Sequence, residues 1–415
     1  MPITFDEREA HFAAATTFDS ERHRKATGGT GAHVARHAVI VTNYIPPHSL
    51  PFYESFQRLV GQLTMLIATP MEGNRHWVPD WGTLRVERLK TFTLRRPWRH
   101  PQGFEETNEV HFPRNAVARL RALKPDVVIA EQLGAAAALS AVYARVVRRT
   151  PLLYWACLSE HTEQGRAAAR RTLRRWLLRR PDCVAVNGRS GAAYLKGFGV
   201  PDERMELVPY CPVMGVFENV PLDRPSRQAH RLLYSGQFVP RKGIVPFLER
   251  LRAWAERHPS RRVEFSLVGD GPQAAELRAM PLPRNLRVAF LGRRGFDELA
   301  TIYADHSILV QPTLADEWGM VANEAMLSGM PILGSQYSQA VWEMVEDGVH
   351  GWTFLPDSPH SMDDAIHRAL AATPTQIAAM RPVVRSVAER RTPEHAADCL
   401  LRAVNKAVRF HHARC

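Results

Sequence analysis

The sequence predicts an α/β protein built from two Rossmann-like domains, each a doubly wound parallel sheet, that face a central cleft. Short apolar segments of strand length alternate with segments of helical composition along most of the chain. Turns that contain glycine follow several of the strands in the second half of the sequence. The 415 residues are enough for two such domains, each with a sizeable core.

The composition is typical of a globular protein without a membrane-spanning segment. Hydrophobic residues make up 45% and charged residues 23% of the chain, and no apolar run is long enough to cross a bilayer. The N-terminal stretch lacks the apolar segment of a secretory signal, and the five cysteines lack disulfide or metal spacing. We therefore expect a cytoplasmic protein. Its formal charge of +12 indicates an anionic partner: phosphorylated substrates, a membrane surface or nucleic acid.

Changes in composition and periodicity divide the chain into five parts. The first residues are polar and rich in glycine, which indicates a flexible arm. Four prolines between 209 and 225, without periodicity, mark a linker between the two domains. The predicted parts are the N-terminal arm at 1–35, a first domain at 36–210, the linker at 211–229, a second domain at 230–392 and a C-terminal helix at 393–415.

The first domain opens with the strand His37–Thr42, and the polar loop after it carries Asn43, Tyr44 and His48. A loop at the carboxyl end of the first strand of a doubly wound sheet faces the ligand crevice. A plain polar turn is the alternative interpretation. Further strands are predicted at 63–69, 125–130, 151–155 and 181–186, whereas residues 70–115 are expected to be irregular apart from short strand-like pieces.

A histidine follows the fourth of these strands. His161 stands after the strand at 151–155, flanked by Glu160 and Glu163, and its position at a carboxyl strand end makes it a candidate site residue. The alternative is a solvated histidine at the start of a helix.

The segment Arg166–Arg180 contains seven arginines and no acid. Leu173, Trp176 and Leu177 have helical i, i+3, i+4 spacing, so the predicted helix has one apolar stripe and a basic remainder. This pattern is typical of a helix that binds an anionic membrane surface, and equally of a helix whose apolar stripe packs on the core. No recognised nucleic-acid-binding fold accompanies the charge, so no nucleic acid partner is expected.

The second domain opens with the strand 231–236, and the turn 237–243 leads into a helix over Ile244–Glu256. Lys242 lies at the junction of this turn and the helix, where it is either a phosphate-binding group or a surface charge. The strands at 263–268 and 286–291 also end in turns. Those turns contain Gly269 and Gly271, and Gly292 with Arg293.

The stretch 313–334, TLADEWGMVANEAMLSGMPILG, combines two acids with a predicted helix start. Asp316 and Glu324 stand eight residues apart, with Gly319 between them, after a short strand at 307–311. A helix starting near Gly319 would present free backbone N–H groups, which suit a phosphate, while both carboxylates could accept hydrogen bonds from sugar hydroxyls. The alternative is an ordinary strand–loop–helix unit with two surface acids.

This stretch, D-E-W-G-M-V-A-N-E-A-M-L-S-G-M-P-I, resembles the family 4 retaining glycosyltransferases of GT-B fold, whose hallmark reads E-P-F-G-L-V-x-x-E-A-x-x-x-G-x-P-V. Asp316 stands where the family has its first glutamate, and Glu317 is one position away as an alternative. Lys242 matches the lysine of the family's G-R-L-x-x-x-K-G turn. Gln237 occupies the place of that turn's arginine, and Arg241 could supply the charge instead.

The resemblance assigns roles to individual residues. It implies that Lys242 stabilises the departing diphosphate, Glu324 holds ribose or sugar hydroxyls, Asp316 holds the sugar and His161 lies near the reacting carbon. The implied nucleotide-sugar site comprises Gly236, Gln237, Arg241, Lys242, Gly269, Gly271, Gly292, Arg293, Trp318, Gly319, Met320, Val321 and Glu324. The implied acceptor side comprises Asn43, Tyr44 and His48 in the first domain, to which the last helix could cross back.

The implied reaction transfers a sugar, with retention, from a nucleoside diphosphate sugar of UDP or GDP type to a hydroxyl acceptor in glycan, polysaccharide or glycolipid assembly. The sequence contains no aspartate-rich metal motif in a plausible setting, so neither a metal nor another cofactor is expected. A lipid-linked acceptor would bring the protein to the inner face of the membrane as a peripheral protein. The alternatives are a GT-B sugar-nucleotide isomerase or phosphorylase, and a non-catalytic nucleotide-sugar-binding protein.

Overall fold

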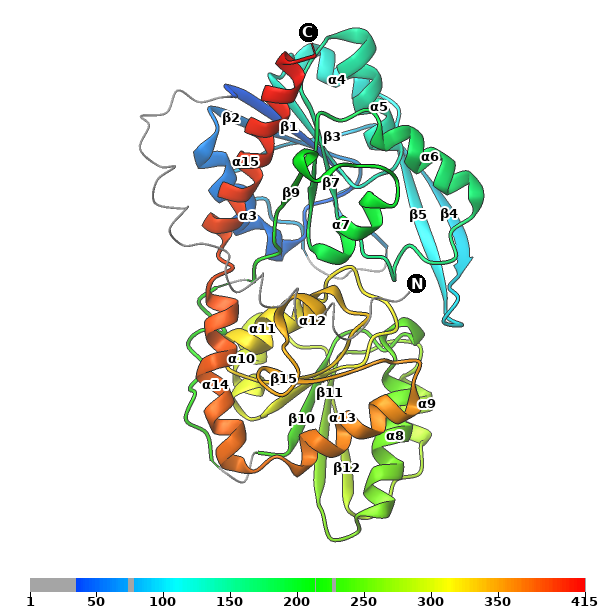
Figure 1. Ribbon diagram of the computed structural model, residues 1–415, viewed down its shortest axis with the longest axis vertical. Helices are drawn as coiled ribbons and strands as arrows, with labels where there is room; N and C mark the ends of the chain where they lie inside the picture. The colour runs from blue at the N-terminus through cyan, green and yellow to red at the C-terminus, as the bar shows by residue number, and fades with distance from the viewer. Residues whose placement is uncertain (1–34, 74–77, 213, 226–228, 415) are drawn as a thin grey trace. The chain divides into compact units, whose positions relative to one another are not determined.

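The computed structural model describes residues 35–73, 78–212, 214–225 and 229–414 (Figure 1). The arm predicted at 1–35 lies outside these residues except for Ala35. Within them the chain forms two parallel sheets, each covered by helices on both faces, and a separate antiparallel strand pair. The predicted fold class is confirmed.

The first sheet has seven parallel strands in the order β3-β2-β1-β6-β7-β8-β9. Their bounds are β1 His37–Thr42, β2 Gln62–Ile67, β3 Arg85–Arg88, β6 Val127–Glu131, β7 Leu152–Ala156, β8 Cys183–Val186 and β9 Met205–Leu207. The strand order reverses beside β1, which pairs with β2 on one side and β6 on the other. Ligands of doubly wound sheets bind at such a switch point, outside the carboxyl ends of the strands.

Successive residues of each strand pack on opposite faces of this sheet. Ala38 and Ile40 of β1 pack with α3 and α15, whereas Val39 and Val41 pack with α4 and α5. Helices α6 and α7 extend this second face. The helices are α3 Leu50–Leu59, α4 Ala116–Leu123, α5 Ala135–Val142, α6 Ala168–Leu178 and α7 Arg189–Lys196, with short turns η1 Pro47–Ser49, η2 Tyr143–Val147 and η3 Asp202–Arg204.

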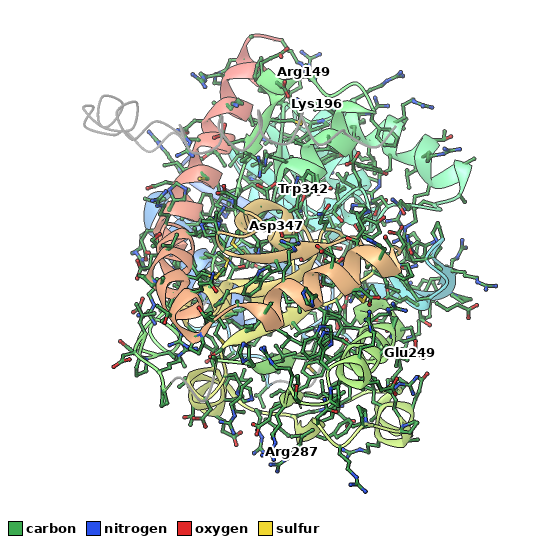
Figure 2. The ribbon with its side chains drawn as sticks, turned by 60° about the horizontal axis from the view of Figure 1, so that its bottom comes forward. Arg149, Lys196, Glu249, Arg287, Trp342 and Asp347 are labelled. Carbon is green, nitrogen blue, oxygen red and sulfur yellow. The ribbon has the colours of Figure 1, made fainter. Side chains whose placement is uncertain are left out.

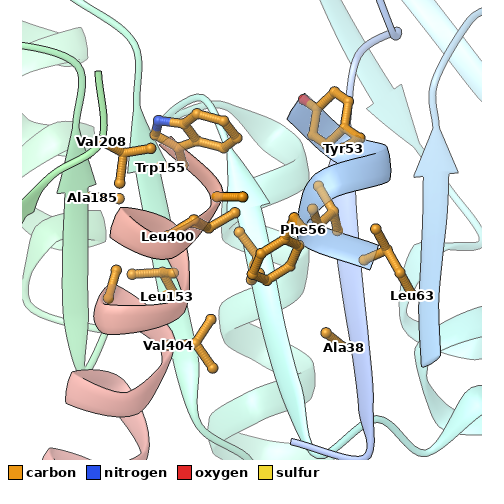
Figure 3. Packing of buried hydrophobic residues seen from close by; sticks show 14 of the residues in the cluster. Ala38, Tyr53, Phe56, Leu63, Leu153, Trp155, Ala185, Val208, Leu400 and Val404 are labelled. Carbon is orange, nitrogen blue, oxygen red and sulfur yellow. The ribbon is translucent and has the colours of Figure 1, made fainter. Parts of the chain in front are cut away.

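The C-terminal helix α15, Pro393–His412, packs on the first sheet (Figure 3). Leu400 and Val404 belong to the same buried cluster as Phe56 of α3 and Leu153 of β7. Ion pairs add to this packing, because the Lys406 ammonium lies 2.8 Å from a Glu206 carboxylate oxygen beside β9. One face of the first sheet is therefore completed by the last residues of the chain.

The segment 70–115 was expected to be irregular apart from short strand-like pieces, and this expectation is wrong for about half of it. Besides β3 it contains β4, Thr91–Arg99, and β5, Glu105–Pro113, which form a two-stranded antiparallel ribbon in continuous register. One face of the ribbon carries apolar side chains, because Phe92 pairs with Phe112 and Leu94 with Val110. On the other face Arg95 pairs with Glu109. Two arginines and Pro97 interrupt the apolar–polar alternation of β4, so the pattern does not predict a strand of this length.

The second sheet has six parallel strands in the order β12-β11-β10-β13-β14-β15. The strands are β10 Arg231–Ser235, β11 Val263–Val268, β12 Leu286–Gly292, β13 Ile308–Gln311, β14 Ile332–Ser335 and β15 Gly351–Phe354. The order reverses at β10, which lies between β11 and β13. The second switch point is therefore outside the carboxyl ends of β10 and β13.

Helices cover both faces of the second sheet as well. One face packs with α8 and α13, and the other with α10, α11, α12 and α14. The bounds are α8 Ile244–Arg257, α9 Ala274–Ala279, α10 Phe296–Ala304, α11 Val321–Leu327, α12 Gln339–Met344, α13 Pro359–Ala371 and α14 Pro374–Glu389, with the turn η5 at Pro240–Lys242. The predicted helix after residue 319 corresponds to α11, which begins two residues later than expected.

We predict that Leu400→Ala destabilises the first domain by about 2–5 kcal/mol, because the substitution leaves a cavity between α15 and β7. Urea unfolding followed by tryptophan fluorescence measures the loss. The matched variant is Arg409→Ala on the exposed side of α15, expected to change stability by less than about 0.5 kcal/mol. Equal effects of the two substitutions would contradict this account of α15.

Candidate active site

The turn after β10 brings Lys242 to the switch point of the second sheet. This turn ends in η5, and Gly243 closes it in the left-handed region with φ +66°. A Cβ on Gly243 would lie 2.1 Å from the Pro312 carbonyl oxygen, so only glycine permits this close approach. The approach places Lys242 beside the loop that follows β13.

Asp316, in that loop, is paired with two cations. Its carboxylate contacts the Lys242 ammonium and lies 3.7 Å from an Arg241 guanidinium nitrogen. The side chain is almost fully buried. Burial raises the pKa of Asp316, but Lys242 and Arg241 outweigh this effect and hold the pKa below its ordinary value. Asp316 is therefore an ionised carboxylate fixed against the cationic turn.

Gly319 links Asp316 to α11 and also requires glycine. Its φ is +99°, and a Cβ there would lie 2.0 Å from Nε2 of Gln311. Glu324 then follows in the first turns of α11, nearly buried, and accepts a hydrogen bond of 3.1 Å from the Tyr303 hydroxyl of α10. Burial raises the pKa of Glu324 to about 7, even though Tyr303 lowers it.

The two motif carboxylates thus differ in charge state near neutral pH. Asp316 is ionised beside Lys242, whereas Glu324 titrates close to pH 7 and can accept or donate a hydrogen bond. Tyr303 also contacts Ser235 at the end of β10. The structure therefore brings Lys242, Asp316 and Glu324 to the same switch point, outside β10 and β13.

Arg241 is committed to protein partners. It donates to the Ala315 carbonyl oxygen at 3.0 Å and to a Glu106 carboxylate oxygen of β5. Gln237, in the place of the family's arginine, accepts a hydrogen bond at its carbonyl oxygen from the Tyr234 hydroxyl at 2.8 Å. Lys242 and Arg241 are therefore both paired with carboxylates in this structure.

The glycine turns after β11 and β12 lie at the same edge as the turn after β10. Gly269 donates its backbone N–H to the Gly292 carbonyl oxygen at 2.8 Å, and Phe238 donates to the Asp270 carbonyl oxygen at 3.0 Å. Gly236, Gly269, Gly271 and Gly292 are thus gathered at one edge. Arg293 is exposed there, with a guanidinium nitrogen 3.9 Å from an Asp270 carboxylate oxygen.

Three of the predicted binding residues have side chains that serve the core. Trp318 is buried, and its indole N–H donates to the Asn323 side-chain oxygen at 2.6 Å. Met320 and Val321 pack against the buried cluster of α11, α12 and α14. These residues can offer a ligand only backbone groups of the helix start.

Two arginines hold the C-terminal end of α11. Arg385 of α14 donates to the Leu327 carbonyl oxygen at 2.6 Å, and the buried Arg224 donates to the Ser328 carbonyl oxygen. Positive charges suit the last turn of a helix, where free carbonyl groups point outward. The helix that carries Glu324 is therefore fixed at the end remote from Asp316.

His161 lies in the loop after β7 and stacks on Tyr337, with ring centroids 3.9 Å apart. Burial lowers the pKa of His161 to about 4, although Asp357 opposes the shift. His161 is therefore a neutral, half-buried imidazole at pH 7 and not a solvated one. The described contacts join it to Tyr337 and to His100, whose ring nitrogen lies 2.7 Å from the His161 carbonyl oxygen.

The loop after β1 places the three acceptor-side candidates at the switch point of the first sheet. Asn43 donates to the Gln132 side-chain oxygen at 2.6 Å, and the Tyr44 carbonyl oxygen accepts from Thr42 at 3.3 Å. His48, in η1, lines a small cavity together with Tyr53 and Glu131. Asn43 and Tyr44 are thus fixed by polar contacts of the loop, whereas His48 borders an open space.

Sequence reasoning missed two partners of the site. Tyr303 lies in α10 outside any motif, and Glu106 lies in the ribbon that was expected to be irregular. A buried tyrosine in an amphipathic helix gives no signal of the carboxylate it serves. Within the described ranges, no three His, Cys, Asp or Glu side chains gather as a metal site, and no helix could cross a membrane.

We predict that Glu324→Gln removes a pH-dependent loss of stability. A carboxyl group with a folded-state pKa near 7 contributes stability below about pH 4.5 that is lost as the pH rises to about 7, by about 3 kcal/mol in total. As the pH rises across this range, the unfolding free energy of the unsubstituted protein should therefore fall relative to that of the variant. The control is Glu276→Gln, at an exposed position of α9. Its unfolding free energy should differ from that of the unsubstituted protein by the same amount at every pH. If the difference in unfolding free energy between Glu324→Gln and the unsubstituted protein does not change with pH, the raised pKa of Glu324 is refuted.

The sequence matches two family descriptions that together span most of the chain. Residues 229–372 match "Glycosyl transferases group 1", and residues 31–211 match "Glycosyl transferase 4-like domain". An uncharacterised glycosyltransferase of Methanocaldococcus jannaschii is 29% identical over 135 residues, 32% of this chain and 36% of the relative. The sulfoquinovosyl transferase SQD2 of Arabidopsis thaliana is 28% identical over 128 residues, 31% of this chain and 24% of the relative. The chain thus spans about a third or less of these relatives.

Solved structures resemble the chain over nearly its whole length. The lipopolysaccharide outer core galactosyltransferase WaaB is 12% identical with a TM-score of 0.66, covering 89% of this chain and 99% of that one. The Anabaena protein HepE, solved in complex with UDP, is 16% identical with a TM-score of 0.62, covering 91% and 100%. At these identities the likeness establishes the fold alone, which is the GT-B arrangement of two parallel-sheet domains.

Proposed function

This chain belongs to the glycosyl transferases group 1, and we propose that it moves a sugar from a nucleoside diphosphate sugar to a hydroxyl acceptor with retention at the anomeric carbon. Two observations carry the proposal: Lys242 contacts Asp316 at the switch point of the second sheet, and Glu324 is held there by Tyr303, which also contacts Ser235 at the end of β10. UDP is the first donor nucleotide to test, because HepE was solved with it, and GDP is the second.

Lys242 is the group that would meet the leaving diphosphate. It is a partly buried cation at the end of a glycine-rich turn, and its partner Asp316 orients it. A phosphate oxygen entering this turn would share the ammonium with Asp316. A positive charge held in a partly dry site stabilises negative charge that develops on a leaving group. We assign no diphosphate contact to Arg241, because Glu106 and Ala315 already occupy it.

The carboxylates would hold the sugar nucleotide. Glu324, with a pKa near 7, suits hydroxyl groups of the ribose or sugar, to which it can donate or from which it can accept. Asp316 would accept from the transferred sugar on the side of Lys242. His161 would offer a neutral imidazole near the reacting carbon.

The proposed transfer needs no metal ion and no further cofactor. The bond between the anomeric carbon and the leaving phosphate oxygen breaks while the bond to the acceptor oxygen forms on the same face. The acceptor proton passes to the leaving phosphate oxygen, so atoms and charge balance. The chain's own residues orient the two substrates and stabilise the diphosphate.

A second candidate, a non-catalytic nucleotide-sugar-binding protein, is favoured by two substitutions in the family motifs. Gln237 replaces an arginine, and Asp316 replaces a longer acid. Such a protein would bind UDP or GDP without consuming a nucleotide sugar. A sugar-nucleotide isomerase, by contrast, would convert its donor without an acceptor. Donor consumption measured with and without a mixed set of sugar acceptors separates these possibilities from the proposed transfer.

We predict that Lys242→Ala lowers kcat by about a hundredfold or more, since it removes the cation opposite the developing phosphate charge. Sugar transfer from UDP- or GDP-sugars, assayed with EDTA present, measures the effect. The matched control is Lys196→Ala, which removes an exposed lysine paired with Asp202 in the first domain and should keep full activity. Unchanged kcat in a folded Lys242→Ala protein would overturn the assignment.

Helix α6 combines a buried side with an exposed basic side. Arg174 is buried and pairs with Glu163 at 3.1 Å, and Arg170 pairs with the same carboxylate at 2.9 Å. Leu177 is fully buried, whereas Leu173 and Trp176 are 45% and 40% exposed. The predicted apolar stripe is therefore divided between the core and the surface.

Further exposed apolar and basic residues follow α5, which neighbours α6 (Figure 1). Val146 is 80% exposed, and the exposed Arg148 and Arg149 come directly after η2; Arg149 is labelled in Figure 2. Exposed apolar side chains among arginines suit the surface of an anionic bilayer. We therefore extend the proposal to peripheral membrane binding, with a glycan or glycolipid acceptor.

We predict that the protein binds anionic vesicles and is released by salt, because each arginine contributes about 1 kcal/mol near such a surface and salt screens it. The test variant reverses the exposed Arg171, Arg175 and Arg179 to Glu and leaves the Glu163 pairs intact. The control reverses the exposed Arg262, Arg284 and Arg287 of the second domain, which gives the same net charge. Co-sedimentation should fail for the test variant alone. Equal binding by both variants would assign the attraction to net charge and refute a specific surface.

A further inference from the structure

A small cavity opens at the carboxyl edge of the first sheet. Its volume is about 20 Å³, room for one group the size of a hydroxyl or a water molecule. The cavity is lined by His48, Ser49, Phe52, Tyr53, Glu131, Trp155, Pro209, Tyr210 and Cys211. Glu131 ends β6 beside the switch point of the sheet, where ligands of such folds bind.

The side chain of Glu131 accepts hydrogen bonds from two hydroxyl groups. The Tyr53 hydroxyl donates to it at 3.0 Å, and the Thr42 hydroxyl also lies within hydrogen-bond reach. In the described part of the chain, no arginine, lysine or histidine forms an ion pair with it. Burial raises the pKa of Glu131. Burial of a carboxyl group without a paired cation costs folding stability. Such groups are found more often at binding sites than elsewhere.

Trp155, at the end of β7, presents the complementary group. The side chain is 94% buried, and its indole N–H has no acceptor among the described residues. Figure 3 shows this nitrogen on the side of Val208, after which Pro209 and Tyr210 line the cavity. A buried N–H without an acceptor costs about 1–3 kcal/mol, and an oxygen atom of a ligand would remove that cost.

Aromatic rings form the wall between these two polar groups. The ring centroids of Phe52 and Trp155 are 5.1 Å apart, and those of Tyr53 and Trp155 are 6.3 Å apart. Aromatic rings offer an apolar surface to the C–H groups of a sugar or polyol, while their polar edges reach its hydroxyls. The cavity thus pairs one acceptor, one donor and an apolar wall.

We propose that this cavity is an acceptor subsite that takes a hydroxyl-bearing, uncharged part of a sugar or polyol, with Glu131 as the residue that selects it; the proposal rests on the proposed function. The ligand hydroxyl donates to Glu131, and a ligand oxygen accepts from the indole of Trp155. A phosphate or carboxylate at the same place would meet the acidic side chain of Glu131, with which no arginine, lysine or histidine of the described residues forms an ion pair. The subsite therefore selects neutral acceptors over phosphorylated ones.

The test uses matched neutral and phosphorylated probes: methyl α-glucoside with glucose 6-phosphate, and myo-inositol with inositol 1-phosphate. Binding is read without catalysis, from the ¹⁹F resonance of Trp155 in protein labelled with 5-fluorotryptophan and assigned with Trp155→Phe. A neutral probe should shift this resonance and leave the exposed Trp176 resonance in place. If neither neutral probe moves the Trp155 signal, or the phosphorylated probes bind more tightly, the subsite is refuted.

Glu131→Gln keeps the shape of the side chain and removes its charge. It should weaken binding of the neutral probes about tenfold, the size expected for a hydrogen bond to a charged group, and narrow the preference over phosphorylated probes. Glu203→Gln, exposed on η3 of the same domain, is the matched control and should bind like the unsubstituted protein. If Glu131→Gln prefers neutral over phosphorylated probes as strongly as the unsubstituted protein does, Glu131 does not select the acceptor.

Transfer assays keep this proposal distinct from the proposed function. If UDP binds and neutral probes shift Trp155 but no sugar is transferred, the proposed function fails while the subsite stands. If transfer occurs and Glu131→Gln changes neither the KM for the neutral acceptor nor the Trp155 shift, the subsite fails while the function stands. The unsubstituted protein and Glu131→Gln should bind UDP with the same affinity, because Glu131 lies in the first sheet and the proposed donor residues lie in the second domain.

Discussion

The ionised carboxylate of Asp316 must be buried without losing its charge, and much of the second domain follows from this constraint. Burial disfavours the charge, so two cations have to come from a different strand end, and Lys242 and Arg241 supply them. The turn after β10 can reach the loop after β13 only where the backbones nearly touch, which requires glycine at 243. The candidate site therefore lies at the one edge where β10 and β13 adjoin.

Charge placement at the two ends of α11 complements this constraint. Asp316 and its cations stand before the helix, while Arg224 and Arg385 satisfy carbonyl groups at its end. Both arginines donate to carbonyl groups at this end of α11, where a positive charge is favourable. A helix of seven residues has little stability of its own, and these contacts with α14 and the linker hold Glu324 in position.

Sequence alone predicted what depends on local pattern. The strands β1 and β10 are continuous apolar runs between turns, and the acids 316 and 324 stand in one motif with Lys242 in another. The ribbon of β4 and β5 was missed because two arginines and Pro97 interrupt the apolar–polar alternation of β4. Glu106 contacts Arg241 across 135 residues, and Trp318 turned inward to Asn323, and neither outcome has a local signal.

The position of α15 has a consequence for the order in which the chain folds during synthesis. A ribosome completes residues 37–207 long before it reaches 393, so the sheet face over Ala38 and Leu153 emerges without its final cover. The apolar face must remain uncovered, or be shielded by other proteins, while the entire second domain is made and folds. The first domain to be synthesised is thus the last to be finished, and a gene divided at the linker would encode an N-terminal half that lacks part of its own core.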